Sequence, residues 1–388
     1  ALLPGFCACA HDVDTAFPPI AKGLGNALAE KPEVRGHVVQ ALVLIVQTAR
    51  SHKAPVVDAS GALVSMGLAP HAQAALDTLG RFGKNFLPLL FNVHQAEPPE
   101  KRPALQEAVR AVASATPAET LGELFAALLR KMLAPEARPE GGAPLAAANV
   151  EARRGLLDLL GSVAPSLSDA QAGMLARATR PALLSPDVLT QKKAYKLLAI
   201  LSASHQGWAR AELPVLRAAL SEALPACASG CKGKRLACLY TVAEALPASE
   251  LAALVPSLLG EVVLATREVN VKTRAAAYEL LVCLAEAIEK RAAGDADRAA
   301  ALRAFLTMVA GGLAGSTLHM IAASLAALGR LTYELRTRAL LEPTIVQLFS
   351  TVLGLLKHGA QEVVKSALTF VKVALVSLRS EAVRPLLP

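Results

Sequence analysis

The sequence predicts an all-α fold, a solenoid in which helix pairs stack one after another. Three observations lead to this prediction. Hydrophobic residues make up 53% of the 388 residues and aromatic residues only 4%, a balance that favours closely packed helices over sheets. Segments in which apolar and polar residues alternate are hard to find. Finally, a basic, alanine-rich sequence motif recurs at the spacing of about 40–47 residues that is typical of HEAT or armadillo repeats.

The recurring motif is predicted to form part of the second helix of each repeat. Its copies are residues 191–198, 234–240, 272–281, 322–328 and 363–370. Pro214, Pro256 and Pro343 precede three of the copies, and proline is well placed near the start of a first helix. This order, proline in the first helix and Lys or Arg early in the second, resembles the HEAT consensus. This pattern therefore predicts roughly five helix pairs from about residue 165 to the end of the chain.

The whole chain is expected to form one solenoid. We predict N-terminal helical repeats over residues 1–133, a flexible loop over 134–150, and further HEAT-like repeats over 151–388. Helical runs in the first part are residues 34–50, 72–94, 105–115 and 121–133. Segments rich in proline, glycine or charge, predicted as loops, are residues 95–103, 134–144 and 291–298. The chain starts without Met and ends as if another helix were beginning, so we expect a part of a longer protein.

The last repeat illustrates how such a helix could divide its faces. A helix over residues 361–378 has apolar residues at three- and four-residue steps. This predicted stripe consists of Val364, Ala367, Leu368, Val371, Ala374, Leu375 and Leu378. Lys365, Lys372 and Arg379 are seven residues apart and follow one flank. Two interpretations stay open: these cations bind an acidic partner, or they pair with carboxylates of the adjoining repeat.

Basic charge is concentrated in one part of the chain. The formal net charge is +8, and residues 177–239 hold ten basic and three acidic residues. Such a cluster indicates a polyanion partner, although basic side chains also cover ordinary surface helices. The candidate RNA- or partner-binding residues are Lys192, Lys193, Lys196, Lys232, Lys234, Arg235, Lys272, Arg274, Lys365, Lys372 and Arg379.

The sequence holds no recognisable catalytic, cofactor or metal motif. The eight histidines are scattered singly, and the glycine-rich segment 311–316 lacks the lysine of a phosphate-binding loop. Cys227 and Cys231 are one helical turn apart, but no histidine lies near them. Apolar runs such as residues 38–46 are too short to span a bilayer. We therefore predict no cofactor, no metal, no membrane partner and no enzymatic activity, in a reducing compartment.

Four segments resemble the ribosomal RNA-processing protein 12 family. They are residues 82–92, 191–198, 310–331 and 363–373, with weak coverage between about residues 96 and 165. The resemblance implies a HEAT/armadillo-repeat assembly factor of the nucleolus, part of the small-subunit processome and of later small-subunit precursors. Such proteins take part in ribosomal RNA maturation and subunit export and are not enzymes. The resemblance assigns no role to any single residue, so the candidate binding residues are predicted from their charge alone.

Two functional hypotheses follow from these observations. The first is a non-catalytic scaffold in the nucleus and nucleolus that binds pre-ribosomal RNA phosphates and other assembly factors, with nuclear transport machinery as a further possible partner. The second is a karyopherin-like transport receptor or export adaptor that binds cargo and a small GTPase, since one solenoid fold serves many functions. Nucleotide-dependent GTPase binding without pre-ribosomal RNA would favour the second.

Overall fold

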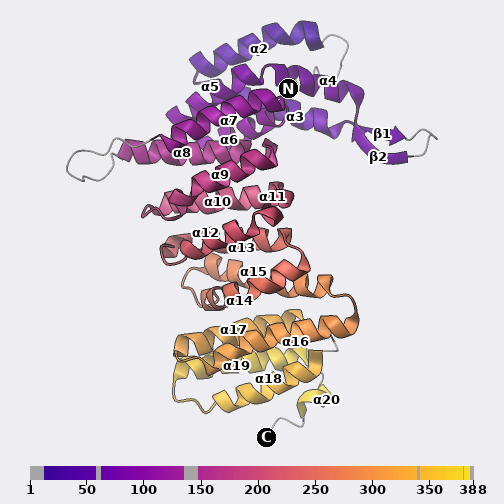
Figure 1. Ribbon diagram of the computed structural model, residues 1–388, viewed down its shortest axis with the longest axis vertical. Coiled ribbons are helices and arrows are strands. Elements are labelled where there is room, and N and C mark those ends of the chain that lie inside the picture. Colours follow the sequence, from indigo (N-terminus) through magenta and orange to yellow (C-terminus); the bar gives the residue numbers. More distant parts are fainter. Residues whose placement is uncertain (1–12, 58–62, 135–146, 339–340, 379, 385–388) are drawn as a thin grey trace. The chain divides into compact units, whose positions relative to one another are not determined.

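The fold is a stack of antiparallel helix pairs, so the predicted all-α solenoid class is confirmed (Figure 1). The computed structural model describes residues 13–57, 63–134, 147–338, 341–378 and 380–384. The chain forms two compact units, residues 1–208 and 209–388. No helix within these described ranges is long and apolar enough to cross a membrane.

In the first unit, helices α5, α7 and α9 form one layer and α6, α8 and α10 form a second. Helix α2 packs on α5, and α3 packs on α6. The elements are α2 (Val13–Glu30), α3 (Arg35–Ser51), β1 (Lys53–Val57), β2 (Leu63–Leu68), α4 (Pro70–Arg81), α5 (Gly83–Ala96), α6 (Arg102–Ala113), α7 (Ala118–Leu133), α8 (Ala147–Val163), η1 (Ala164–Ser166), α9 (Asp169–Leu183) and α10 (Val188–Ser204). Short α11 (Gln206–Ala211) contains the boundary between the units.

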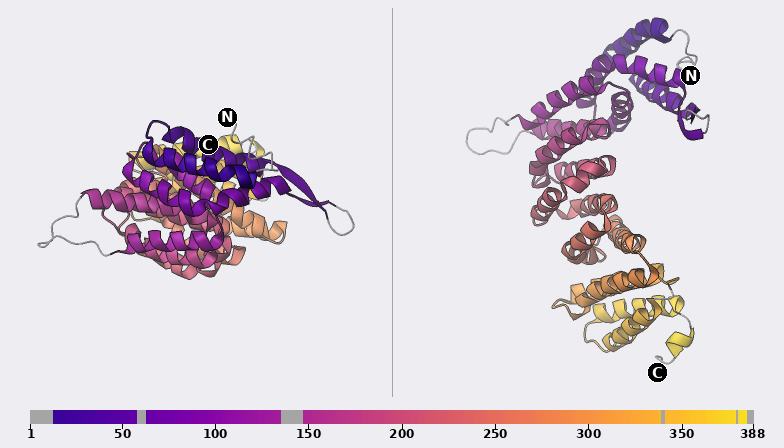
Figure 2. Two further views of the ribbon diagram at one scale, coloured as in Figure 1. Left: turned by 90° about the horizontal axis from the view of Figure 1, so that it is seen from above. Right: turned by 45° about the vertical axis from the view of Figure 1, so that its right-hand side comes forward.

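In the second unit, the second helices α13, α15, α17 and α19 pack on one another in chain order. Helices α14, α16 and α18 pair with α15, α17 and α19, respectively; Figure 2 shows the same helices from two further directions. The elements are α12 (Leu213–Glu222), η2 (Ser229–Cys231), α13 (Lys232–Ala245), α14 (Ala248–Ala265), α15 (Val271–Arg291), α16 (Asp295–Gly311), η3 (Gly312–Ala314), α17 (Leu318–Glu334), α18 (Glu342–Leu355), α19 (Gln361–Ser377) and α20 (Ser380–Val383).

The prolines mark helix starts less regularly than the sequence suggested. Pro214 and Pro343 do lie in the first turn of α12 and α18. Pro256, however, lies in the middle of α14, which begins after Pro247. An interior proline costs about 3 kcal/mol, but Val255, Leu258 and Leu259 beside it are buried. Each such side chain contributes about 1.5–3 kcal/mol, so burial outweighs the lost backbone hydrogen bond.

The connections agree in part with the predicted loops. The predicted loop 95–103 narrows to residues 97–101, between α5 and α6. Of the predicted loop 291–298, only residues 292–294 lie between helices α15 and α16. Asp295 and Asp297 belong to the first turn of α16, where their negative charge complements the helix dipole. Most of the predicted loop 134–150 lies outside the described residues, and α8 already begins at Ala147.

A β-hairpin between α3 and α4 is an addition that the sequence analysis did not foresee. Strands β1 and β2 pair antiparallel, with Lys53 opposite Leu68 and Pro55 opposite Met66. The pairing shifts by one residue between Val56 and Val57. The two strands are the only sheet in the described part of the chain, and they project away from the helices (Figure 1).

The buried face of α19 is rotated from the predicted apolar stripe and shares only Ala367 and Ala374 with it. The buried residues are Val363, Ser366, Ala367, Phe370 and Ala374. Of the predicted stripe, Leu368 is 46% exposed and Leu375 is 43% exposed. Phe370 is buried where α19 packs on α17. A Cβ added to Gly329 of α17 would lie 3.9 Å from the Cα of Phe370, an ordinary van der Waals distance. The buried aromatic residue, rather than the number of leucines, therefore marks the inner face of α19.

Replacing Phe370 by alanine should strongly destabilise the second unit, because it leaves a cavity at the α17–α19 contact. We expect a loss of about 3–5 kcal/mol in the free energy of unfolding, measured by urea denaturation. Leu368→Ala, on the exposed side of the same helix, should cost less than about 1 kcal/mol. An equal loss in both variants would contradict the observed phase of α19.

Candidate nucleic-acid interface

The predicted basic residues that the structure describes all come from second helices, and they differ in exposure and in their partners. Lys192, Lys193 and Lys196 lie on α10; Lys232, Lys234 and Arg235 on α13; Lys272 and Arg274 on α15; and Lys365 and Lys372 on α19. Arg379 lies outside the described residues. Their partners and exposure decide which of them can meet a ligand.

Arg235 lies in the interior of the second unit and is not a surface contact. The side chain is 1% exposed. Its Nε donates to Oε1 of Glu261 at 2.6 Å and its Nη2 to Oε2 at 3.0 Å, while Nη1 donates to the carbonyl of Leu220 at 2.7 Å. This fork joins α12, α13 and α14. The sequence could not show this, because Glu261 is 26 residues away along the chain.

Three further candidates are held by neighbouring segments. Lys193 pairs with Asp158 of α8, and Lys232 pairs with Glu268, which follows α14. Arg274 donates from Nη1 to the carbonyls of Glu268 at 2.8 Å and Val269 at 2.9 Å, in the connection before α15. These three side chains are therefore held by contacts within the protein, through carboxylates for Lys193 and Lys232 and through backbone carbonyls for Arg274.

Five candidates remain open to solvent. They are exposed and have no ion pair within the described part of the chain. We call them the free lysines: Lys196, Lys234, Lys272, Lys365 and Lys372. Lys192 is half-buried. The free lysines are therefore the members of the predicted set that can reach a polyanion.

In the first unit, a residue outside the predicted set joins them. Arg110 on α6 is exposed and lines a small hollow together with Lys193 and Lys196 of α10. Helix α8 packs against both α6 and α10, so it spaces these cations. Arg110 was not among the predicted residues, because it lies far from the basic stretch 177–239. Its place near the end of the predicted helix 105–115 was the one available signal.

In the second unit, the N-terminal ends of α13 and α15 meet. A Cβ on Gly233 would lie 3.2 Å from Oγ1 of Thr273, so glycine permits this close approach. Lys234 and Lys272 are the immediate sequence neighbours of the two contacting residues. Helix N-termini carry partial positive charge, which attracts phosphate. Two lysines and two helix ends therefore give this part of the surface a positive potential.

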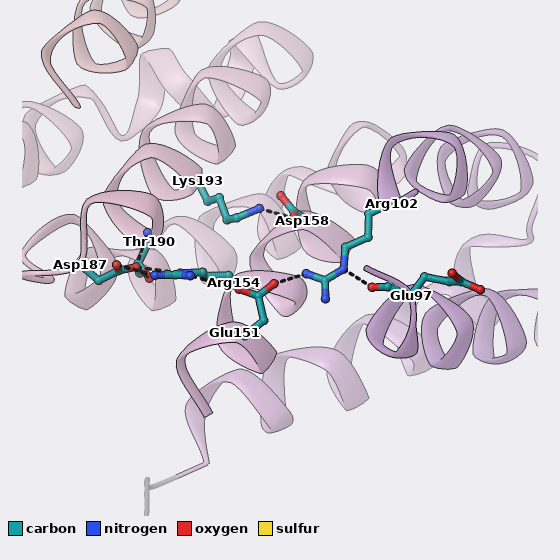
Figure 3. A network of polar contacts seen from close by, with 8 residues as sticks. All are labelled: Glu97, Arg102, Glu151, Arg154, Asp158, Asp187, Thr190 and Lys193. Atoms are coloured by element: carbon teal, nitrogen blue, oxygen red, sulfur yellow. Dashed lines mark hydrogen bonds and ion pairs between the residues drawn. The ribbon is translucent and has the colours of Figure 1, made fainter. Parts of the chain in front are cut away.

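The first unit contains a ladder of ion pairs, formed by Arg102, Glu151, Arg154 and Asp187 (Figure 3). Buried Arg102 of α6 donates from Nε to the carbonyl of Glu97 at 2.9 Å and pairs with Glu151 of α8. Arg154 donates to Glu151 at 3.1 Å and to both carboxylate oxygens of Asp187, at 2.9 and 2.6 Å. The ladder thus connects α6, α8 and the start of α10.

Asp187 is the last member of the ladder and also caps α10. Its Oδ2 accepts from the backbone N–H of Thr190 at 2.8 Å. The guanidinium of Arg154 and these hydrogen bonds hold the pKa of Asp187 well below its usual range, although its partial burial acts in the opposite direction. The carboxylate therefore stays charged and fixes the helix that carries Lys193 and Lys196.

His94 lies beside this ladder, in the interior. It is fully buried, and burial lowers its pKa to about 4, with Asp158 acting in the opposite direction. The side-chain amide of Gln106 approaches Nε2 at 3.4 Å, whereas Nδ1 has no partner. The neutral ring is therefore the form that the folded chain holds near neutral pH.

The described residues show no arrangement suited to metal binding or thiol chemistry. No group of three or more His, Cys, Asp or Glu side chains is placed to hold a metal ion within the described ranges. Cys231 is buried and Cys227 half-buried. Burial raises the pKa of Cys238 to about 12, which suppresses the reactive thiolate.

Fold and surface together define a helical-repeat protein of the HEAT class with free lysines on its second helices. Residues 1–97 match the family "Ribosomal RNA-processing protein 12, HEAT repeats". The chain is 34% identical to the RRP12-like protein of Gallus gallus over 97% of its length, and 29% identical to the putative ribosomal RNA-processing protein 12 of Schizosaccharomyces pombe over 100%. The resemblance predicted from four segments is confirmed over nearly the whole chain.

The chain covers only part of these relatives, 27% of the Gallus gallus protein and 33% of the Schizosaccharomyces pombe protein. Among solved structures, yeast importin-β matches with a TM-score of 0.56 at 12% identity, over 96% of this chain and 46% of that one. Kap121p matches with a TM-score of 0.55 at 13% identity, over 96% and 35%. Identities this low show a shared fold and no more.

Arg235→Ala should destabilise the second unit severely, because it leaves the carboxylate of Glu261 without its partner in a mostly buried place. We expect a loss of about 3–5 kcal/mol in the free energy of unfolding. The matched control is Lys234→Ala, one residue away and exposed, which should change stability by less than about 0.5 kcal/mol. Urea denaturation followed by circular dichroism measures both, and similar values would contradict the buried fork.

His94→Leu should weaken the dependence of stability on pH between about pH 4 and 6.5. The unfolded chain binds a proton at this histidine below about pH 6.5, while the folded chain does so only below about 4. The wild type therefore loses stability as pH falls through this window. Unfolding free energies at pH 7 and 4.5 should differ less in His94→Leu than in the wild type or in the exposed control His37→Gln. A variant with an unchanged difference would contradict the buried neutral ring.

Proposed function

We propose that this chain is a non-catalytic scaffold in small ribosomal subunit biogenesis, which binds pre-ribosomal RNA through its phosphates. The observation that carries the proposal is the set of free lysines, together with Arg110, on the second helices of a HEAT-type stack. Similarity to proteins named for ribosomal RNA processing supports the process. The whole relatives are three to four times longer than this chain, so it supplies one segment of such a scaffold.

The chemistry of the surface favours phosphates over bases as the RNA contact. Lysine ammonium groups are point charges that attract phosphate without reading sequence. Aromatic side chains that could stack on bases are scarce: the single Trp208 is buried. Binding of this kind depends strongly on salt, because each phosphate contact releases counterions. We therefore place the specificity of the scaffold in its protein partners and in RNA shape.

Other assembly factors of the small-subunit processome are the protein partners that we propose, with nucleus and nucleolus as the location. Helical stacks present long surfaces that suit several partners at once. The absence of a recognisable catalytic set in the sequence supports a scaffold over an enzyme.

The alternative of a karyopherin-like adaptor rests on fold alone. Importin-β and Kap121p share the helical stack at 12% and 13% identity, a level that says nothing about cargo or GTPase binding. We keep transport machinery only as a partner of the longer protein during subunit export.

Removing three free lysines should weaken RNA binding and flatten its dependence on salt. For Lys196→Gln/Lys234→Gln/Lys272→Gln, we expect the slope of log affinity against log salt to fall by about 2, since each phosphate contact contributes roughly 0.7–0.9. Fluorescence anisotropy with a labelled stem-loop of pre-ribosomal RNA, from 50 to about 200 mM salt, measures the slope.

The matched control removes the same charge elsewhere. Arg217, Arg303 and Lys357 are exposed and lie outside the second helices. Arg217→Gln/Arg303→Gln/Lys357→Gln should leave the slope close to that of the wild type. Equal slopes in both triple variants would reduce the effect to net charge and contradict the proposed surface.

A further inference from the structure

We infer that the outer edge of strand β2 is a docking site for an extended segment of a partner protein, which adds to the hairpin as a third strand. This site is separate from the lysine surface and goes beyond the proposed function. The hairpin formed by β1 and β2 projects from the helices of the first unit, so that its strands lie apart from them in both figures (Figures 1 and 2).

The hairpin exposes apolar side chains on both of its faces. Leu63 and Val64 are each 65% exposed, Met66 is 57% exposed and Val56 is 45% exposed. An isolated two-stranded hairpin is marginally stable in water, and a third strand or a covering helix is what normally completes it. Helix α3 contacts β2, yet Leu63, Val64, Ser65 and Met66 all remain exposed. Within the part of the chain that the structure describes, no element therefore covers most of β2.

The register shows which backbone groups point outward. The carbonyl of His52 accepts from the N–H of Ala69 at 3.0 Å, so His52–Ala69 is a hydrogen-bonded pair. Lys53–Leu68 and Pro55–Met66, one and three residues further along, are pairs of the opposite, non-bonded kind. Because antiparallel pairs alternate between bonded and non-bonded, the backbone groups of these two pairs face away from the partner strand. Met66 and Leu68 thus present N–H and C=O groups on the outer edge of β2, at the spacing of a strand.

The two edges of the hairpin differ in how they are protected. The outer edge of β1 carries Pro55, which has no N–H to offer, and Lys53, whose charge discourages strand pairing. Strand β2 contains neither a charged residue nor a proline. Proteins usually protect exposed edge strands with such residues. Protection of one edge only directs an incoming strand to β2.

The chemistry of this edge selects an extended peptide as its occupant. Backbone donors and acceptors at strand spacing are matched by another backbone in extended form, and exposed apolar side chains accept alternate apolar residues. The strand is uncharged, so it offers nothing to RNA phosphates. One added strand of about six residues buries far less than the roughly 1,600 Å² of a stable interface between folded proteins. A flexible segment of a partner fits this edge better than a second copy of the chain.

The test uses Met66→Pro, which removes the outward N–H of β2 and leaves the hydrogen bonds between β1 and β2 intact. A library of random ten-residue peptides displayed on phage is selected on the wild-type chain. We expect the selected peptides to alternate apolar and polar residues and to bind Met66→Pro at least about tenfold more weakly, because one peptide carbonyl loses its donor. Hydrogen exchange at the amides of Met66 and Leu68 should slow when a peptide binds the wild type.

Two measurements keep the result decisive. Met66→Thr keeps the N–H and should bind the same peptides much more tightly than Met66→Pro, and unchanged thermal unfolding of Met66→Pro shows that the unit is intact. Peptides that bind Met66→Pro as tightly as the wild type, or a selection that yields no peptide preferring the wild type, would overturn the inference. Self-association through the same edge would also overturn the inference. It would appear as a sedimentation coefficient that rises with protein concentration for the wild type and Met66→Thr but not for Met66→Pro.

Discussion

Close packing of the second helices on one another is the contact on which the rest of this structure depends. Ala194, Ala277, Ala322, Ala323 and Ala367 are buried on second helices, and Gly329 meets Phe370 where α17 approaches α19. Small side chains at these positions let neighbouring backbones approach, and a larger residue would force them apart. Within each unit, the spacing of the second helices, and with it the spacing of the cations that they carry, follows from this packing.

The basic residues of the recurring motif are either paired inside the protein or exposed to solvent, according to their position around the helix. On α10, Lys193 turns toward Asp158 of the preceding second helix, while Lys196 faces solvent. On α13, adjacent Lys234 and Arg235 differ by about 100° of rotation, which places one in water and the other in the interior. A paired cation contributes little field outside the protein, because its carboxylate cancels it at short range. The free lysines therefore dominate the attraction of a polyanion.

Periodicity predicted the stack of helix pairs because each second helix carries its own apolar pattern, and that pattern is local. It did not predict the pairing of charges, because Asp158, Glu261 and Glu268 lie outside the basic stretch 177–239 and reach it only in the folded chain. The net charge of residues 177–239 therefore overstates the positive electrostatic potential at their surface. The hairpin was missed for a related reason: β2 is exposed on both faces and shows no alternation, although alternation is the signal by which a half-buried strand is found.

The ion-pair ladder and the free lysines place opposite demands on the same helices. A surface that binds phosphate must keep cations unpaired, and their mutual repulsion acts against the compact stack. Ion pairs offset this within the first unit: Glu151 and Asp187 neutralise Arg102 and Arg154 in the ladder, and Asp158 neutralises Lys193. Arg110 and Lys196 can then remain unpaired at the surface. In this arrangement the paired charges hold α6, α8 and α10 in register, and the unpaired charges are left for a partner.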